Sequence, residues 1–166
     1  AELRGSRTGV FIGVSESESG IYWKEDPDKV NGYGLTGSCR AMFANRLSYT
    51  FDFTGPSYAL DTACSSSLVA MQRGVAAIKS GECDAAIIGG CNICIQPTTS
   101  LQFHRLNMLS EEGMCKAFDS TGNGYVRSEA VGIMFLQKAS NARRIYATVL
   151  GAKVNTDGHK QQGITF

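Results

Sequence analysis

The sequence predicts an α/β domain with a largely buried sheet. Two apolar runs, residues 8–14 and 84–90, have the length and continuity of strands that are covered on both faces. Other segments carry apolar residues at helical spacing, so strands and helices alternate along the chain. The 19 glycines fall mostly at the ends of these segments, where the turns of an α/β fold need them.

The first part of the chain begins with the strand at 8–14. The polar segment 16–31 contains Pro27 and predicts a loop with a short helix. Residues 35–49 predict an amphipathic helix, because their apolar side chains recur at helical spacing. Gly-Pro at 55–56 then ends this helical region.

The central part is expected to be a strand, a helix and a strand. Residues 58–63 predict a strand that leads directly to Cys64. Apolar residues between 68 and 78 share one helical face, and Gly81 is well positioned as the C-cap of that helix. The buried strand at 84–90 follows.

The last part predicts a helix at 98–109, a loop-rich segment at 117–129 and strands at 131–136 and 145–154. No repeat, linker or low-complexity tract divides the chain, so residues 1–166 are expected to form a single partial domain without an internal boundary. The chain does not begin with methionine and has no polar tail. Both ends are therefore expected to be cut from a longer protein.

Charge and hydropathy exclude two classes of partner. The formal net charge is +1 and no basic run is present, so nucleic acid is not an expected ligand. No apolar stretch approaches the roughly 18–20 residues that cross a bilayer, and no secretory leader opens the chain. Six cysteines among abundant aliphatic residues indicate reduced, mostly buried thiols and a cytoplasmic location.

Cys64 is the strongest candidate for a catalytic residue. It follows the strand at 58–63, begins an amphipathic helix, and has small residues on both sides. These features predict a sharp strand-to-helix turn of the kind that presents the nucleophile of hydrolases. Backbone N–H groups and the positive end of the helix dipole favour a thiolate at such a turn. A buried structural cysteine is the alternative that spacing alone leaves open.

Three other patterns resemble binding motifs and are interpreted as structural. Cys91 and Cys94 form a C-x-x-C, but the chain has no second ligand pair for zinc and no helix start for a redox site there. Residues 32–37 match G-x-G-x-x-G, but a polar segment precedes them instead of a strand. Residues 119–124 begin like a calcium loop, but Ala130 stands where a carboxylate is required.

The two histidines, His104 and His159, are the only imidazoles of the chain. Either side chain can act as a base for Cys64, but the distance in sequence between each histidine and Cys64 does not indicate that role. A surface or structural role is the favoured interpretation for both.

Residues 61–68, DTACSSSL, resemble the active-site signature of β-ketoacyl synthases, the condensing enzymes of fatty acid and polyketide synthesis. Residues 40–48 are similar to the synthase domain of animal-type multifunctional fatty acid synthase, with polyketide synthases a close second. Further blocks follow in the order of the family: ANRLSY at 44–49, FDF at 51–53, GPS at 55–57, GGCN at 89–92, MLS at 108–110, CKAFD at 115–119, GYVRSE at 124–129 and NTDG at 155–158.

The resemblance implies a thiolase-like layered αβαβα fold, present as an incomplete fragment with the N-terminal half and part of the connection to the second half. It implies an acyltransferase, a 3-oxoacyl-[acyl-carrier-protein] synthase. Cys64 would accept an acyl group as a thioester, and its backbone N–H would help to hold the oxyanion. Malonyl-carrier would then lose CO2 and supply the carbanion that attacks the acyl-cysteine.

The resemblance also implies the partners. Substrates would arrive on the phosphopantetheine arm of an acyl carrier protein, and no cofactor or metal would be bound by the domain itself. The parent protein would be a cytoplasmic homodimer that binds neither nucleic acid nor membrane.

The sequence departs from the family in two ways. The family's two catalytic histidines, a lysine and a glycine-rich loop belong to blocks downstream of residues 155–158 and are not among these 166 residues. The fragment alone is therefore expected to be inactive in condensation, and His159 is not assigned a catalytic role. Cys91 and Cys94 stand where the family has aliphatic residues, which favours a core position for both.

Two other functions use this fold. A non-catalytic synthase-like subunit need not keep a nucleophile, and a thiolase uses coenzyme A instead of a carrier protein. The sequence DTACSSS favours a synthase over both. Four residues are candidates for the wall of an acyl pocket, with core packing as the alternative: Met42, Phe43, Phe103 and Met108. Apolar sheet faces are expected to remain exposed, with poor solubility or a non-native oligomer as the consequence.

Overall fold

The computed structural model of the protein describes residues 3–24 and 26–161. The chain divides into two compact units. The first comprises residues 1–91 and 131–154, and the second comprises residues 92–130 and 155–166. The first unit holds the sheet and Cys64.

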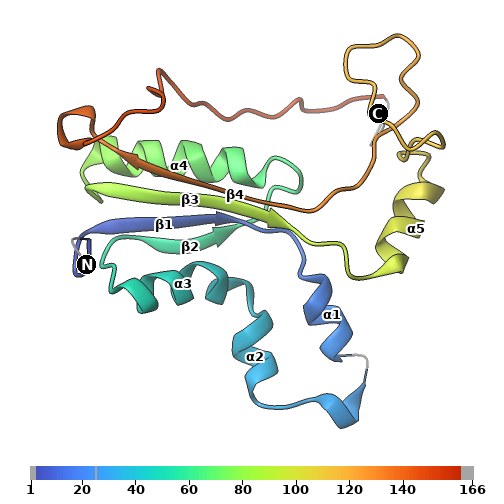
Figure 1. The fold of residues 1–166 in the computed structure, drawn as a ribbon, viewed down its shortest axis with the longest axis horizontal. Coiled ribbons are helices and arrows are strands. Elements are labelled where there is room, and N and C mark those ends of the chain that lie inside the picture. The colour runs from blue at the N-terminus through green and yellow to red at the C-terminus, as the bar shows by residue number, and fades with distance from the viewer. Residues whose placement is uncertain (1–2, 25, 162–166) are drawn as a thin grey trace. The chain divides into compact units, whose positions relative to one another are not determined.

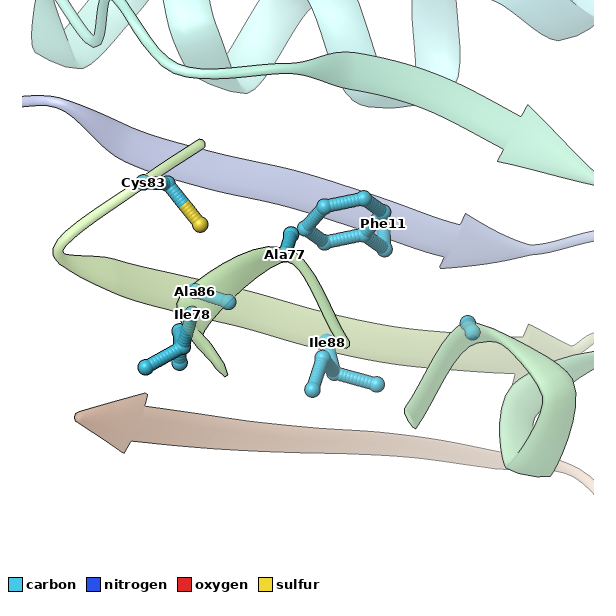
Figure 2. Packing of buried hydrophobic residues seen from close by; sticks show 7 residues of the cluster. Phe11, Ala77, Ile78, Cys83, Ala86 and Ile88 are labelled. Carbon is cyan, nitrogen blue, oxygen red and sulfur yellow. The ribbon is translucent and has the colours of Figure 1, made fainter. Parts of the chain in front are cut away.

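The first unit is built on a four-stranded sheet in the order β2-β1-β3-β4 (Figure 1). The central strand β1 (Thr8–Gly13) pairs in parallel with β2 (Ser57–Leu60) on one side and with β3 (Ala85–Asn92) on the other. The strand β4 (Ala130–Gln137) lies beside β3 and runs in the opposite direction (Figure 2). The four strands predicted at 8–14, 58–63, 84–90 and 131–136 are confirmed, with ends that differ by at most three residues.

One helix from each connection between the parallel strands packs against the sheet. Between β1 and β2 the chain forms α3 (Arg40–Phe51), and between β2 and β3 it forms α4 (Ser66–Ser80). The two connections move in opposite directions along the sheet, so right-handed crossovers put their helices on opposite faces. Figure 1 shows α3 and α4 on the two faces of the sheet. The predicted C-cap is confirmed, because Gly81 ends α4 in the left-handed conformation with φ 81°.

The core between α4 and the sheet consists of small and aliphatic residues around one aromatic ring (Figure 2). Gly74 of α4 allows this close packing, because a Cβ atom there would lie only 2.7 Å from Cδ1 of Ile88. The buried members of this cluster are Phe11, Ala70, Ala77, Ile78, Cys83, Ala86 and Ile88.

A second cluster packs between the other face of the sheet and α3. Side chains alternate along β1, so Val10 and Ile12 point to this cluster while Phe11 belongs to the first. Ala44 is the buried residue that α3 contributes, and Phe43 and Leu47 are half-buried beside it. All six residues of β1 are buried, which confirms the predicted covered strand.

The helix predicted at 35–49 is two helices. The first is α2 (Tyr33–Ser38) and the second is α3, separated by Cys39 with φ −66° and ψ 129°. Extended backbone at this residue interrupts the helical hydrogen bonds, and the apolar spacing continues across the interruption. The short helix predicted within 16–31 is confirmed as α1 (Glu18–Lys24), followed by the 3-10 turn η1 (Pro27–Lys29).

The strand predicted at 145–154 is wrong. After β4 comes the 3-10 turn η2 (Ala139–Asn141), and residues 145–154 then form neither helix nor strand. Most of their large apolar side chains lie open to solvent, with Tyr146 84% and Leu150 93% exposed. An apolar pattern forms a strand only where a sheet edge pairs with it, and none of the described strands pairs with this segment.

The second unit contains α5 (Pro97–Arg105) and a long loop. The helix predicted at 98–109 is confirmed but ends four residues early. The loop closes on itself through an isolated bridge between Leu109 and Tyr125, with the Tyr125 amide donating to Met108 at 3.0 Å. None of the helices in the described part of the chain is long and apolar enough to cross a membrane.

Candidate active site

Cys64 lies in the turn between β2 and α4. The strand ends at Leu60 and the helix begins at Ser66, so Cys64 stands two residues before the first helical residue. The cysteine is exposed and its thiol is free. The strand-to-helix turn predicted from the sequence is confirmed.

The turn contains a strained residue directly before the cysteine. Ala63 has φ 56°, in the left-handed region that residues other than glycine rarely occupy. For a residue with a Cβ atom this conformation costs about 1–2 kcal/mol. The surrounding contacts therefore have to hold the sharp turn that exposes Cys64.

Asp61 supplies one set of these contacts. One carboxylate oxygen, Oδ1, accepts the backbone N–H of Ala63 at 3.0 Å, and the other, Oδ2, accepts Nη1 of Arg40 at 2.8 Å. The bond from Ala63 is the main cause that lowers the pKa of Asp61 below its usual value, and Ser15 and Arg40 act in the same direction. Asp61 therefore remains a carboxylate at neutral pH and ties the turn to the start of α3.

Hydroxyl groups hold the other side of the turn. The buried Ser66 accepts the N–H of Thr62 at 2.9 Å and donates to the carbonyl of Ala63 at 2.6 Å. Ser65 donates to the carbonyl of Thr62 at 2.9 Å. Although Ser65 is the N-cap residue of α4, its side chain makes no capping bond to the helix. The serines after Cys64 therefore fix the turn and leave the first helical amides without a side-chain cap.

Two glycines bring the start of α4 against the sheet. A Cβ atom on Gly13, at the carboxyl end of β1, would lie 2.5 Å from the backbone nitrogen of Ser67. A Cβ atom on Gly90, in β3, would lie 2.9 Å from Cβ of the same serine. Sequence reasoning counted these glycines only as general turn residues. The sequence signal for this close approach of α4 to the sheet was the position of both glycines near the carboxyl ends of predicted strands.

Two of the four acyl-pocket candidates line a groove of about 350 Å³ in the first unit. Met42 and Phe43 contribute to it from α3, and the sheet contributes residues of β1, β3 and β4. The remaining lining residues are Ile12, Gly37, Arg46, Leu47, Gly90, Cys91, Val131 and Ile133. The groove is mostly apolar, which suits an aliphatic chain.

The other two pocket candidates belong to the second unit. The ring of Phe103 makes an edge contact with Tyr125 at a centroid distance of 6.1 Å, and Met108 is half-buried in the same unit. His104, on α5, and His159 also belong to this unit, and both are exposed. The unit that carries Cys64 contains no histidine.

The expectation of mostly buried thiols is wrong. Cys83 is the buried cysteine, and burial raises the pKa of its thiol. Cys91 is exposed and Cys94 is half-buried, so the core position predicted for Cys91 is also wrong. The exposed cysteines lie in turns and loops or near the end of a strand, where the side chain reaches the surface. The remaining exposed thiols are those of Cys39, Cys64 and Cys115.

The glycine and aspartate patterns have local structural roles. The G-x-G-x-x-G at 32–37 lies mostly within α2 and follows the turn η1 instead of a strand. The carboxylate of Asp119 accepts both the amide and the hydroxyl of Thr121, at 2.8 and 2.9 Å. These bonds lower the pKa of Asp119 and close a turn. No group of three or more potential metal ligands occurs among the residues that the structure describes.

Sequence relatives point to one family. The family model described as "Beta-ketoacyl synthase, N-terminal domain" matches residues 1–142. A fatty acid synthase of Anser anser anser is 54% identical over 166 residues, which cover 100% of this chain and 47% of that protein. Probable polyketide synthase 1 of Dictyostelium discoideum is 47% identical over 161 residues, which cover 95% of this chain and 5% of that protein.

Solved structures agree with the sequence relatives. The oxazolomycin ketosynthase domain of Streptomyces albus JA3453 matches with a TM-score of 0.73 and 40% identity, over 84% of this chain and 25% of that chain. The ketosynthase from module 6 of the bacillaene synthase of Bacillus subtilis 168 matches with a TM-score of 0.73 and 33% identity, over 83% of this chain and 23% of that chain.

The chain thus spans about half of the goose fatty acid synthase and about a quarter of each solved ketosynthase chain. The α/β fold and the condensing-enzyme resemblance predicted from the sequence are both confirmed. The chain belongs to the β-ketoacyl synthase family, which it matches over the N-terminal domain.

Proposed function

We propose that this chain is the nucleophile-bearing part of a condensing acyltransferase, in which Cys64 accepts the growing acyl group. The observation that supports this proposal is the exposed Cys64 at the turn between β2 and α4, immediately after the strained Ala63. A thiolate suits the task because it is both a good nucleophile and a good leaving group.

The acyl transfer is a thioester exchange. The sulfur of Cys64 attacks the carbonyl carbon of an acyl thioester carried on the phosphopantetheine arm of an acyl carrier protein. A new S–C bond forms at Cys64, the bond to the carrier sulfur breaks, and the proton of the Cys64 thiol ends on the released carrier thiol. The backbone N–H of Cys64 helps to hold the oxyanion that develops on the carbonyl oxygen.

Condensation completes the proposed reaction. Malonyl-carrier releases CO2, and the resulting carbanion attacks the carbonyl carbon of acyl-Cys64. The Cys64 thiolate leaves, and a 3-oxoacyl thioester longer by two carbons remains on the carrier. The histidines that the family uses for these steps belong to blocks outside the 166 residues, so the proposed contribution of this chain ends with acyl-Cys64.

The proposed setting follows the family. The carrier delivers its arm to the exposed side of the turn, and the parent protein is a cytoplasmic homodimer. The sheet supports assembly with a second chain, because it ends in an edge strand on each side, β2 and β4. Edge strands present unpaired backbone groups to a second chain.

The test is acylation of Cys64 by an acyl carrier protein loaded with a saturated acyl group. Mass spectrometry of the intact protein and of its peptides should show the acyl group on the peptide that contains Cys64. The variant C64A should lose this product. C115A is the matched control, because Cys115 is also exposed and free, and it should be acylated at the wild-type rate.

Undiminished acylation in C64A would contradict the proposal, and so would equal labelling of Cys64 and Cys115. A coenzyme A thiolysis assay with a 3-oxoacyl-coenzyme A should give no product. A positive result there would indicate a thiolase instead.

A ketosynthase of a polyketide synthase is the second candidate, because the Dictyostelium polyketide synthase is 47% identical over most of the chain. The two roles differ in the acyl donor. A fatty acid chain is fully reduced before the next extension, whereas a polyketide chain keeps oxygen. Faster acylation of Cys64 by saturated donors than by 3-hydroxyacyl donors favours the fatty acid role, and the reverse order favours the polyketide role.

A further inference from the structure

One carboxylate links the Cys64 turn to a segment that is distant in sequence. The internal bonds of the turn, from Ser65 and Ser66, join residues of the turn to each other or to the first turn of α4. Asp61 differs because its two oxygens bind different segments: Oδ1 accepts the Ala63 amide at 3.0 Å and Oδ2 accepts Arg40 at 2.8 Å.

Arg40 is well suited to fix this carboxylate. It is the first residue of α3, the helix whose Ala44 is buried against the sheet. One carboxylate thus ties the turn to the first residue of a helix that packs against the sheet.

The Ala63 amide is the point at which this network acts on the cysteine. Ala63 precedes Cys64 and holds a φ of 56°, so rotation at this residue changes the direction of the Cys64 side chain. The hydrogen bond that its amide donates to a carboxylate fixed by Arg40 restricts that rotation. The carboxylate itself does not have to touch the substrate.

We propose that Asp61 is a positioning residue for Cys64, with Arg40 holding its carboxylate in place, an inference that rests on the proposed function of Cys64 as acyl acceptor. Misplacement of a reacting group by about 1 Å can cost on the order of 100-fold in rate. D61A should therefore lower the maximal rate of acyl-Cys64 formation by roughly 10- to 100-fold. The donor concentration at half-maximal rate should stay nearly unchanged, because Asp61 acts on the orientation of Cys64 and not on the carrier.

Three variants, D61A, D61N and R40M, separate the roles of the two carboxylate oxygens of Asp61. D61N keeps an oxygen that accepts the Ala63 amide and loses the charged partner of Arg40, so it should recover most of the rate lost in D61A. R40M removes the guanidinium and keeps Asp61, so its loss should lie between those of D61N and D61A. R40M also covers the case in which D61A does not fold, because it keeps Asp61 and its bond to the Ala63 amide and still predicts a loss of rate.

The chain offers a matched control in a second Arg–Asp pair. Arg7 and Asp84 form an equally short contact, 2.8 Å, in the same unit and without contact to the turn; the two arginines are similarly exposed, and Asp84 is more exposed than Asp61. D84A removes this pair and should leave acylation of Cys64 at the wild-type rate. A loss in D84A equal to that in D61A would overturn the proposal, because it would reveal a general stability effect.

Hydrogen–deuterium exchange tests the positioning without any acylation. The peptide covering residues 61–66 should exchange faster in D61A than in the wild type and in D84A, because the Ala63 amide loses its acceptor. Unchanged exchange in D61A overturns the proposal, as does a wild-type rate of acylation. If the wild-type protein is not acylated at Cys64, the proposed function fails, and the exchange result still decides whether Asp61 holds the turn.

Discussion

The strands β1 and β4 belong to one sheet and have similar apolar sequences, TGVFIG and AVGIMFLQ, but their burial is opposite. Every residue of β1 is buried, and Phe11 is 0% exposed. In β4 six of eight residues are exposed, and Phe135 is 43% exposed. β1 lies between two strands and between two helices, whereas β4 is an edge strand.

The difference shows what an apolar run encodes. It predicts that a segment forms a strand, because β-branched and aromatic side chains suit the pleated backbone. It does not encode what covers the strand, since that depends on which elements pack above and below. Two pairs of variants test this contrast between centre and edge directly, and two further measurements concern the β4 edge and the starts of the inner strands β1 and β3.

The largest expected effect is the loss of Phe11. Its ring belongs to the cluster between α4 and the sheet, so F11A should reduce the free energy of unfolding by about 3–5 kcal/mol. F135A removes the same ring from the partly exposed β4 and should cost about 1 kcal/mol or less. Urea titrations of the two variants measure both values. Equal losses of unfolding free energy would mean that β4 is covered as completely as β1.

The next effect concerns a glycine on each strand. Gly13 of β1 meets the backbone of Ser67, so G13A should force α4 away from the sheet and cost about 1–3 kcal/mol. It should also slow acylation of Cys64. Gly132 of β4 has open space around it, so G132A should be neutral or slightly stabilising. A stable G13A with normal acylation would show that α4 adjusts without cost.

Much of the central region could be predicted from the sequence. The strand before Cys64, the apolar face of α4 and its C-cap at Gly81 all depend on neighbours in the chain, which periodicity and glycine positions report. Asp61 and Gly13 could not be recognised as parts of the site. Their roles depend on Arg40 and Ser67, which are distant in sequence and meet them only when the strands pair in the observed register.

The edge region was predicted less well for the same reason. Residues 145–154 have the composition of a strand but find no strand to pair with, so they stay irregular. The position of the cysteines was also missed, because composition indicates a preference for burial and not the position of each residue at an element end.

A smaller effect is expected for association through the β4 edge. Val131 is 68% exposed on this strand, and an exposed apolar edge favours pairing with other chains. V131K should therefore shift the protein toward monomer, as measured by light scattering at several concentrations. L150K is the control, because Leu150 is 93% exposed in an irregular segment, and it should shift association less. Identical effects of V131K and L150K would indicate that exposed apolar side chains in general, and not the β4 edge, cause the association.

The smallest effect is the pH dependence of the Arg7–Asp84 pair, which joins the starts of β1 and β3. The hydrogen bond from Arg7 lowers the pKa of Asp84 in the folded protein. Its contribution is therefore present above the unfolded pKa of about 3.9 and disappears as the pH falls through the folded pKa. D84N should be less stable than the wild type at neutral pH, and the difference should vanish in strong acid.

Denaturation curves between neutral and acid pH measure this convergence, and added salt should reduce the difference at neutral pH because the pair is exposed. A difference that grows as the pH falls would contradict the assignment of the shift to Arg7.

The contact of Gly13 with the main chain of Ser67 has a consequence for genetic screens. A saturation library scored by acyl transfer should find positions 13 and 64 similarly intolerant, although only one of them carries reactive chemistry. Second-site suppressors of G13A should not arise at Ser67, because the obstructing atoms are backbone atoms that every amino acid shares. Suppressors should instead map to the interface between α4 and the sheet, above all to Ile88 beside Gly74, where a smaller side chain would let the helix take a new position.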